Sequence, residues 1–339
     1  MSDYDVFRAG DVVLQSGVTA TDMRLAYRTY GTLNAPKDNA ILYPTSFSAR
    51  HSDIDYLVAP GGVLDPTRYF VIIPNLFGNG LSSSPSNCEG IPSSKFPFIT
   101  FDDAVKIQRQ LVREAFGITR LALVYGWSMG GMQAYHWAAL YPDMVERIAV
   151  ICGSARCSPY NQVFLESVKA ALMADPAFEG GRFISAPVRG LKAMGRIYAG
   201  WAMSYDYYRT ESWRRDGFAS LEEYLAQSWD VAFAARDAND LLSQIAMWQR
   251  GDISASPSFG GDFTKAMAAI TAKVLLVPGR TDSYFQVRDN EDELPLLVNA
   301  ASAELLPIPS INGHRAGNPR RSSEDRAFLV EAISRFLRA

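Results

Sequence analysis

The sequence contains few cysteines, few histidines and no long apolar run. Its 339 residues include three cysteines and three histidines. An odd cysteine count does not suit a disulfide framework, and Cys152 and Cys157 do not have a usual zinc spacing, so we expect free thiols and no metal site. No apolar run approaches membrane-spanning length, and Asp3, Asp5 and Arg8 interrupt the first ten residues, which excludes the apolar core of a signal peptide. We therefore expect a cytoplasmic protein without a membrane partner.

Basic charge is also not in excess. The formal net charge is −3, and no basic stripe carries interleaved aromatic residues, which excludes a typical nucleic-acid binder. The turn Gly78-Asn79-Gly80 begins like a dinucleotide fingerprint, but Ser83 stands where the third glycine is needed, and no phosphate-binding P-loop is present. We therefore expect no cofactor. The length and the 48% hydrophobic content indicate one large globular domain, or one domain with an insertion.

Strand-like and helix-like segments alternate along the first 155 residues. A threonine cap followed by acidic residues predicts a helix that begins at Thr100 and ends at Gly117. Short apolar or alternating runs that stop at turn residues predict strands at 24–30, 40–43, 69–73, 121–125 and 145–151. This alternation predicts an α/β fold with a mostly parallel central sheet flanked by helices.

The pattern changes between residues 158 and 264. This segment is rich in Trp, Tyr, Met and Ala at helical spacing and has no clear strand pattern. Strand patterns return at 273–277 and 303–307, and an amphipathic helix follows at 323–337. We therefore expect a core formed by residues 1–157 and 265–339, with residues 158–264 inserted as a helical lid.

The most informative motif is Gly126-Trp127-Ser128-Met129-Gly130. It lies between a predicted strand and a predicted helix, which is the setting of a nucleophile elbow. Glycines on both sides permit the sharp turn, and the turn holds the serine hydroxyl above the sheet at a helix N-terminus. We expect Ser128 to be a catalytic nucleophile.

A serine nucleophile needs a base and an acid that orients the base. In α/β-hydrolases the chain order is serine, acid, histidine, and of the three histidines only His314 follows both a later strand and an acidic candidate. His51 precedes the serine, and His136 is more consistent with helix packing. Asp282 follows the strand at 273–277 and is the favoured acid; the alternatives Asp289 and Asp292 lie further along, on an expected helix surface.

An oxyanion would be held by two backbone N–H groups. The first is that of Met129, directly after the serine, and the second comes from the loop after an early strand. Ser46, or a residue next to it, is the candidate in that loop, and the adjacent Phe47 is a candidate for substrate contact.

Several segments resemble the homoserine O-acetyltransferase family of α/β-hydrolase-fold enzymes. The similarity is carried by 75–80, by 126–133 with the sequence Gly-Trp-Ser-Met-Gly-Gly-Met-Gln, and by Asp175-Pro176. The resemblance implies a Ser-Asp-His triad at Ser128, Asp282 and His314. It also implies a helical lid, a homodimer built through the lid, and ping-pong acyl transfer with acetyl-CoA as a co-substrate.

The chain also departs from that family. Ser46-Phe47-Ser48 stands in place of a Leu-Thr-Gly stretch, and Lys169 stands near an arginine that the resemblance links to a substrate carboxylate. Lysine keeps the charge but lacks the bidentate fork. We therefore expect a divergent member: a serine acyl-ester hydrolase of small esters or thioesters, with an O-acetyltransferase as the alternative. A non-catalytic binding protein of the same fold is a third, remote hypothesis. Lys169 either contacts substrate or is a surface lysine.

Overall fold

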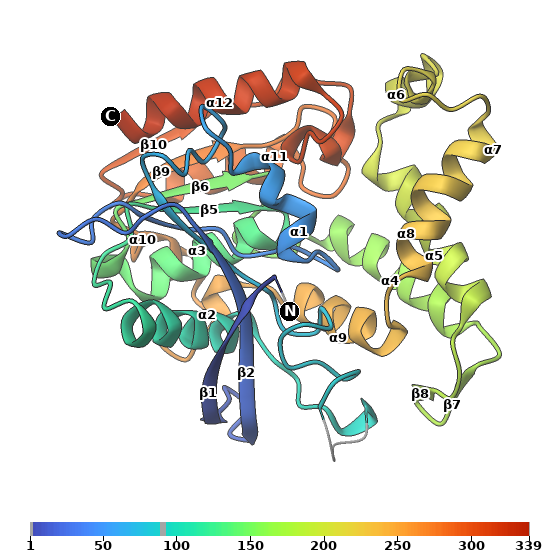
Figure 1. Cartoon of the computed structure of the whole chain (residues 1–339), viewed down its shortest axis with the longest axis horizontal. Coiled ribbons are helices and arrows are strands. Elements are labelled where there is room, and N and C mark those ends of the chain that lie inside the picture. Colours follow the sequence, from blue (N-terminus) through green and yellow to red (C-terminus); the bar gives the residue numbers. More distant parts are fainter. Residues whose placement is uncertain (1–2, 89–92, 339) are drawn as a thin grey trace.

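Eight strands form the central sheet of the computed structural model, which describes residues 3–88 and 93–338 (Figure 1). Their order across the sheet is β1-β2-β4-β3-β5-β6-β9-β10. The pairs β1–β2 and β2–β4 are antiparallel, and all other pairs are parallel. The strands are β1 (Asp5–Val13), β2 (Thr19–Tyr30), β3 (Ala40–Leu42), β4 (Phe70–Pro74), β5 (Leu123–Trp127), β6 (Arg147–Ile151), β9 (Lys273–Val277) and β10 (Ser302–Leu305). The predicted mostly parallel sheet is confirmed.

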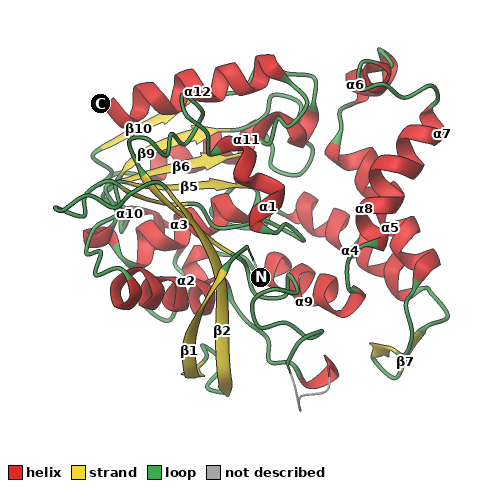
Figure 2. Cartoon of the chain, viewed as in Figure 1, coloured by secondary structure: helices red, strands yellow, loops and turns green. Residues whose placement is uncertain are grey.

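Both faces of the sheet are buried, which explains why its central strands read as apolar runs. In β3, for example, Ile41 belongs to one apolar cluster, and Ala40 and Leu42 belong to the other. Helices α1 (His51–Ile54) and α12 (Ser323–Arg338) cover the first face, and α2 (Phe101–Gln110), α3 (Met129–Leu140) and α10 (Phe263–Ala268) cover the second (Figure 2).

Helix α2 illustrates how closely the sequence specifies these boundaries. The Thr100 hydroxyl accepts the N–H of Asp103 at 3.1 Å, and the Asp103 carboxylate accepts the N–H of Thr100 at 3.0 Å. The threonine cap is the one expected from the sequence, and together the two bonds form a reciprocal capping box. After Gln110 the helix continues as a short π-helical segment, η3 (Leu111–Ala115), and then ends at Gly117 with φ of +63°.

The segment after β6 forms a layer of helices beside the sheet, apart from its covering helices (Figure 1). Ser158 caps the first of these helices by accepting the N–H of Asn161. The helices are α4 (Pro159–Met173), α5 (Val188–Ala202), α6 (Tyr205–Arg209), α7 (Leu221–Tyr224), α8 (Val231–Ala234) and α9 (Ala238–Gln249). The segment also contains a small hairpin of β7 (Phe178–Glu179) and β8 (Arg182–Phe183), which the sequence reading missed.

Two other features differ from the sequence expectations. Strand β1 was not predicted, and the predicted division between residues 264 and 265 falls inside α10. The division into core and lid stays a prediction, and residues 1, 2, 89–92 and 339 of the expected core lie outside the described residues. Among the described helices, none is both long and apolar enough to cross a membrane.

Candidate active site

Ser128 occupies a sharp turn between β5 and α3. Its backbone has φ of +58° and ψ of −127°, a conformation that costs a non-glycine residue free energy. The crowded turn requires the flanking glycines: a Cβ on Gly126 would lie 2.0 Å from the carbonyl oxygen of Gly130, and one on Gly130 would lie 2.7 Å from that of Pro44. The elbow geometry expected from the motif is therefore present.

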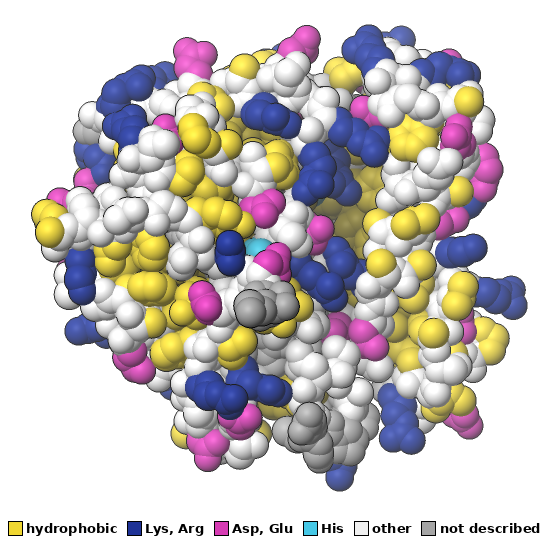
Figure 3. All heavy atoms as spheres, in the orientation of Figure 1, with side chains coloured by type: hydrophobic (Ala, Val, Ile, Leu, Met, Phe, Trp, Pro, Cys, Tyr) yellow, Lys and Arg dark blue, Asp and Glu magenta, His cyan; other side chains and the backbone are white. Residues whose placement is uncertain are grey.

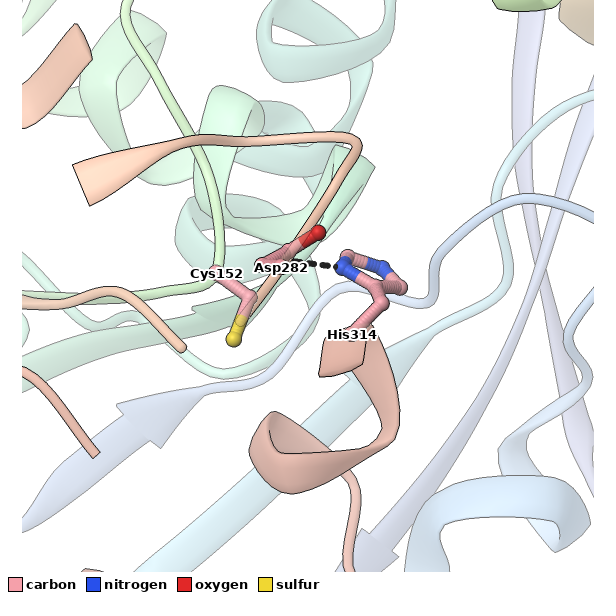
Figure 4. A group of neighbouring side chains, drawn as sticks. All are labelled: Cys152, Asp282 and His314. Atoms are coloured by element: carbon pink, nitrogen blue, oxygen red, sulfur yellow. Dashed lines mark hydrogen bonds and ion pairs between the residues drawn. The ribbon is translucent and has the colours of Figure 1, made fainter. Parts of the chain in front are cut away.

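Asp282 and His314 come together from two separate segments. Asp282 lies in the loop after β9, and His314 lies in a short helix, η9 (Gly313–Gly317). Nδ1 of His314 is 2.7 Å from Oδ2 of Asp282, and both side chains are buried (Figure 4). Oδ1 of Asp282 accepts the backbone N–H groups of Tyr284 and Phe285 at 2.7 and 3.3 Å. The carboxylate is thus held in place from both sides.

Ser128 and His314 line the same cavity, which has a volume of about 240 Å³. Aromatic rings fix the imidazole: Trp127 stacks on it at 4.9 Å between centroids, and Tyr284 meets it edge-on at 4.7 Å. Within the described residues no hydrogen bond joins the Ser128 hydroxyl to His314. Such bonds are often long before a substrate binds.

The predicted oxyanion donors lie in this region. Ser46 and Phe47 line the cavity, and the Ser46 hydroxyl donates to the backbone carbonyl of Trp127. Met129 is the first residue of α3, directly after Ser128. In the part of the chain that the structure describes, no acceptor takes the backbone N–H of Ser46, Phe47 or Met129. The Phe47 ring stacks on Tyr198 at 5.5 Å in the cavity wall.

Lys169 is not brought into this cavity. Its ammonium group pairs with Glu166, one turn earlier on α4, at 3.2 Å, and its side chain is exposed. Because Lys169 does not line the cavity of Ser128 and His314, the structure favours the surface lysine over the substrate contact.

The residues set aside in the sequence analysis have other partners. His136 is buried in α3, with Nδ1 2.8 Å from the carbonyl oxygen of Met132. Nδ1 of His51 is 3.2 Å from the side-chain amide of Asn75. Asp289 caps helix α11 (Val287–Glu293), and Asp292 on the same helix pairs with Arg288 at 3.1 Å.

The sequence reading did not associate Cys152 with this site. The Cys152 Sγ, a carboxylate oxygen of Asp282 and a ring nitrogen of His314 all lie within 4.8 Å of one another (Figure 4). This spacing is short enough for the three residues to be considered as a metal site. Burial and the nearby Asp282 carboxylate raise the pKa of the Cys152 thiol well above its usual value, and His314 already occupies Oδ2 of Asp282. The hydrogen bond from Nδ1 of His314 to Oδ2 of Asp282 is the arrangement of an acid–base pair.

Three cavity-lining arginines, Arg236, Arg315 and Arg320, were also missed. The adjacency of Arg315 to His314 was the one signal in the sequence that could have indicated its place. Arg236 lies just after α8, and its place in the cavity depends on the packing of that helix near Asp53 of α1.

Comparisons with known proteins identify the family. A family model described as "alpha/beta hydrolase fold" matches residues 61–294. The chain belongs to the alpha/beta hydrolase fold family. This alpha/beta hydrolase is 38% identical over 316 residues to a probable esterase of Corynebacterium glutamicum, covering 92% of this chain and 89% of that protein. It is also 38% identical over 315 residues to an ethyl acetate hydrolase of Pseudomonas veronii, with the same two coverages.

The resemblance to homoserine O-acyltransferases is confirmed as a more distant relationship. A homoserine O-succinyltransferase of Methylibium petroleiphilum is 32% identical over 336 residues, covering 89% of this alpha/beta hydrolase and 86% of that protein. Among solved structures, the acetyl esterase MekB superimposes with a TM-score of 0.95 at 34% identity, covering 100% of this chain and 97% of that one. The family is one of hydrolytic enzymes, and esterases stand at higher identity than acyltransferases.

Proposed function

We propose that the protein is a serine esterase that hydrolyses small acyl esters. The observation that carries this proposal is the buried pair of Asp282 and His314 at 2.7 Å, which shares a cavity with Ser128 on its elbow. The cavity volume of about 240 Å³ lies below the ~300–1,000 Å³ usual for drug-sized ligands, which favours a small ester as substrate. The esterase relatives at 38% identity support the same reaction.

In the proposed acylation step, Nε2 of His314 takes the hydroxyl proton as Ser128 Oγ bonds to the ester carbonyl carbon. The carbonyl π electrons move onto its oxygen, which the N–H of Met129 and that of Ser46 or Phe47 stabilise. When this intermediate collapses, the carbon–oxygen bond to the alcohol breaks, and the alkoxide takes the proton from His314. The products of this step are a free alcohol and an acyl ester on Ser128.

The proposed deacylation step repeats this chemistry with water. His314 takes a proton from water as the water oxygen attacks the acyl carbon, and it then returns that proton to Ser128 Oγ. The carboxylic acid leaves, and the enzyme is restored. Asp282 holds the imidazole tautomer with the proton on Nδ1 and stabilises the imidazolium throughout. The cycle needs no cofactor.

The first test is acetate release from ethyl acetate, together with covalent labelling by a fluorophosphonate. The wild-type chain is expected to do both, and Ser128→Ala is expected to do neither. A Ser167→Ala variant is a matched control, because Ser167 is a half-buried serine on α4 that does not line the cavity and whose hydroxyl donates to the carbonyl of Val163. Turnover by Ser128→Ala at the wild-type rate would refute the assignment.

The second candidate function is acyl transfer, with acetyl-CoA as a co-substrate and homoserine or another hydroxyl compound as acceptor. The relationship to a homoserine O-succinyltransferase at 32% identity favours it. Release of CoA from acetyl-CoA, measured with and without L-homoserine, separates the two functions. Strong stimulation by homoserine would establish the transferase, whereas acetate release from esters without any acceptor would establish the hydrolase.

We also propose that two copies of the chain associate through the lid. Seven large apolar side chains are exposed on this layer: Tyr160, Val163, Ile184, Val188, Tyr205, Leu221 and Val231. They are seven of the twelve large apolar side chains exposed among the described residues, and exposed apolar surface is a common feature of interfaces. Val163→Asp is expected to give a monomer by sedimentation, whereas Val13→Asp, at an equally exposed valine on β1, is expected to leave the dimer intact. The cytoplasmic location stays a prediction.

A further inference from the structure

The guanidinium of Arg315, in the cavity wall, has no ion-pair or hydrogen-bond partner among the described residues. Arg315 directly follows His314 in η9, and it lines the cavity together with Ser128. Its guanidinium carbon lies 5.1 Å from the centroid of the Trp229 ring, on the lid side of the cavity. Throughout residues 3–88 and 93–338, no carboxylate forms an ion pair with Arg315, and no side-chain hydrogen bond engages its guanidinium. Its charge is therefore available to a ligand.

The other two arginines of the cavity are already engaged. Nη2 of Arg236 pairs with Oδ2 of Asp53 at 2.9 Å, which links α8 of the lid to α1 of the core. Nη2 of Arg320 donates to the backbone carbonyls of Ser52 and Asp53 at 3.2 and 3.1 Å. Among the described residues that line the cavity, Asp53 is the one carboxylate. The wall therefore carries an excess of positive charge, and Arg315 is the one of these three arginines whose guanidinium no oxygen of the described residues engages.

The surface around the cavity agrees with this distribution. Lysine and arginine side chains lie along the edge of a hollow between the sheet and the lid, with acidic side chains among them (Figure 3). The positive charge of Arg315 also acts on buried groups. Burial raises the pKa of Tyr198 and of Tyr284, both in the cavity wall, and the charge of Arg315 acts on each of them in the opposite direction. A cation beside a low-dielectric wall attracts an anion more strongly than a cation in open water does.

The place of Arg315 indicates which part of a substrate it meets. In the proposed reaction His314 delivers a proton to the departing alkoxide, so the alcohol portion of the ester must lie against His314. Arg315 is the next residue and lines the same space. Its planar fork suits a carboxylate, which can accept two parallel N–H bonds.

We infer that Arg315 selects esters whose alcohol portion carries a carboxylate. This inference rests on the proposed esterase function and names its substrate class: acyl esters of hydroxy acids. The carboxylate pairs with the Arg315 guanidinium at the cavity mouth while the ester carbonyl reaches Ser128. In the absence of substrate, Arg315 rests against Trp229.

The test compares two matched esters, 4-acetoxybutanoate and its neutral amide, 4-acetoxybutanamide. They differ in charge and hardly in size. We expect wild-type kcat/KM to be at least tenfold higher for the anionic ester, mainly through a lower KM, and this preference to shrink as ionic strength rises. In Arg315→Gln the preference is expected to fall at least tenfold, and Arg315→Lys is expected to retain part of it because the charge remains. Arg321→Gln is the matched control, since Arg321 lies outside the cavity and pairs with Asp216 at 3.6 Å, and it is expected to keep the wild-type preference.

The relative rates of hydrolysis of the two esters show whether Arg315 selects for a carboxylate. If the wild-type chain hydrolyses both esters equally, or if Arg315→Gln keeps the full preference, Arg315 is a surface arginine packed on Trp229 and the inference is wrong. The proposed esterase function would then still stand, because Ser128 would react with both esters. If the wild-type chain hydrolyses neither ester and a fluorophosphonate does not label Ser128, the proposed function fails, and the inference fails with it.

Discussion

Oδ2 of Asp282 lies 2.7 Å from Nδ1 of His314, while two backbone N–H groups hold Oδ1 of the same carboxylate. This arrangement leaves Asp282 one orientation and gives the imidazole one tautomer. Because the pair is buried against Trp127 and Tyr284, solvent contributes little to its alignment.

Asp282→Asn is expected to lower kcat for a small ester by about four orders of magnitude, because an amide cannot stabilise the imidazolium or enforce the tautomer. Steady-state kinetics measures the loss, and circular dichroism checks that the fold is kept. Asp289→Asn is the control, since Asp289 caps α11 and does not bond to His314. A variant Asp282→Asn with activity within tenfold of wild type would place the acid elsewhere.

Gly126→Ala is expected to destabilise the chain by about 3 kcal/mol or more, because its Cβ would lie 2.0 Å from a backbone oxygen that cannot move alone. Urea unfolding gives the free energy. For comparison, a Cβ at Gly200 in α5 meets no atom within 4 Å, so Gly200→Ala is expected to stabilise by about 0.5 to 1 kcal/mol. Equal effects at the two sites would contradict this account of the elbow.

Glu293 gives a prediction for the pH dependence of stability. Its carboxylate is buried and accepts the Tyr135 hydroxyl and the Ala155 N–H, each at 2.7 Å, and the Asn290 amide at 2.8 Å. Burial is the largest effect and raises the pKa of Glu293 from 4.5 to about 7. The folded state therefore keeps a proton that the unfolded state has released. The stabilisation is complete below pH 4.5 and is lost as the pH rises through 7.

Glu293→Gln removes this ionisation. Between pH 5 and pH 8 the free energy of unfolding of the wild-type chain is expected to fall relative to that of the variant by about 2.5 kcal/mol. Urea unfolding at several pH values measures the difference. Glu291→Gln changes an exposed residue of the same helix, so its free energy of unfolding is expected to depend on pH as that of the wild type does. If the free energies of unfolding of Glu293→Gln and of the wild type change with pH in parallel, the pKa of Glu293 is not raised.

Lys169→Ala is expected to change KM for the anionic ester by less than twofold and stability by less than about 0.5 kcal/mol, since its pair with Glu166 is exposed. Measuring KM for the anionic and neutral esters in this variant checks the placement. A rise in KM confined to the anionic ester would return Lys169 to the list of substrate contacts.

The features that could be predicted from the sequence are those determined by a few neighbouring residues. The glycines around Ser128, the strand before Asp282 and the cap at Thr100 each leave a local pattern, and the predicted places of these residues agree with the structure. Strand β1 was missed because its pairing with β2 shifts register on both sides of Gly10, which breaks the alternation.

Other features depend on packing that no local pattern records. The helix containing Glu293 reads as a charged surface helix, yet Glu293 itself is buried. Arg236 reaches the cavity only because α8 meets α1 there. Lys169 was weighed as a substrate contact because the resemblance places an arginine nearby, but the rotation of α4 decides which way that position faces.

The backbone of Ser128 has one more consequence. A φ of +58° costs serine about 1 to 3 kcal/mol of free energy. Glycine adopts this conformation at almost no cost. Ser128→Gly would therefore melt at a higher temperature than the active chain while lacking the hydroxyl. Engineering this protein for a higher melting temperature alone would therefore favour inactive variants. Each stabilised variant must also be assayed for turnover.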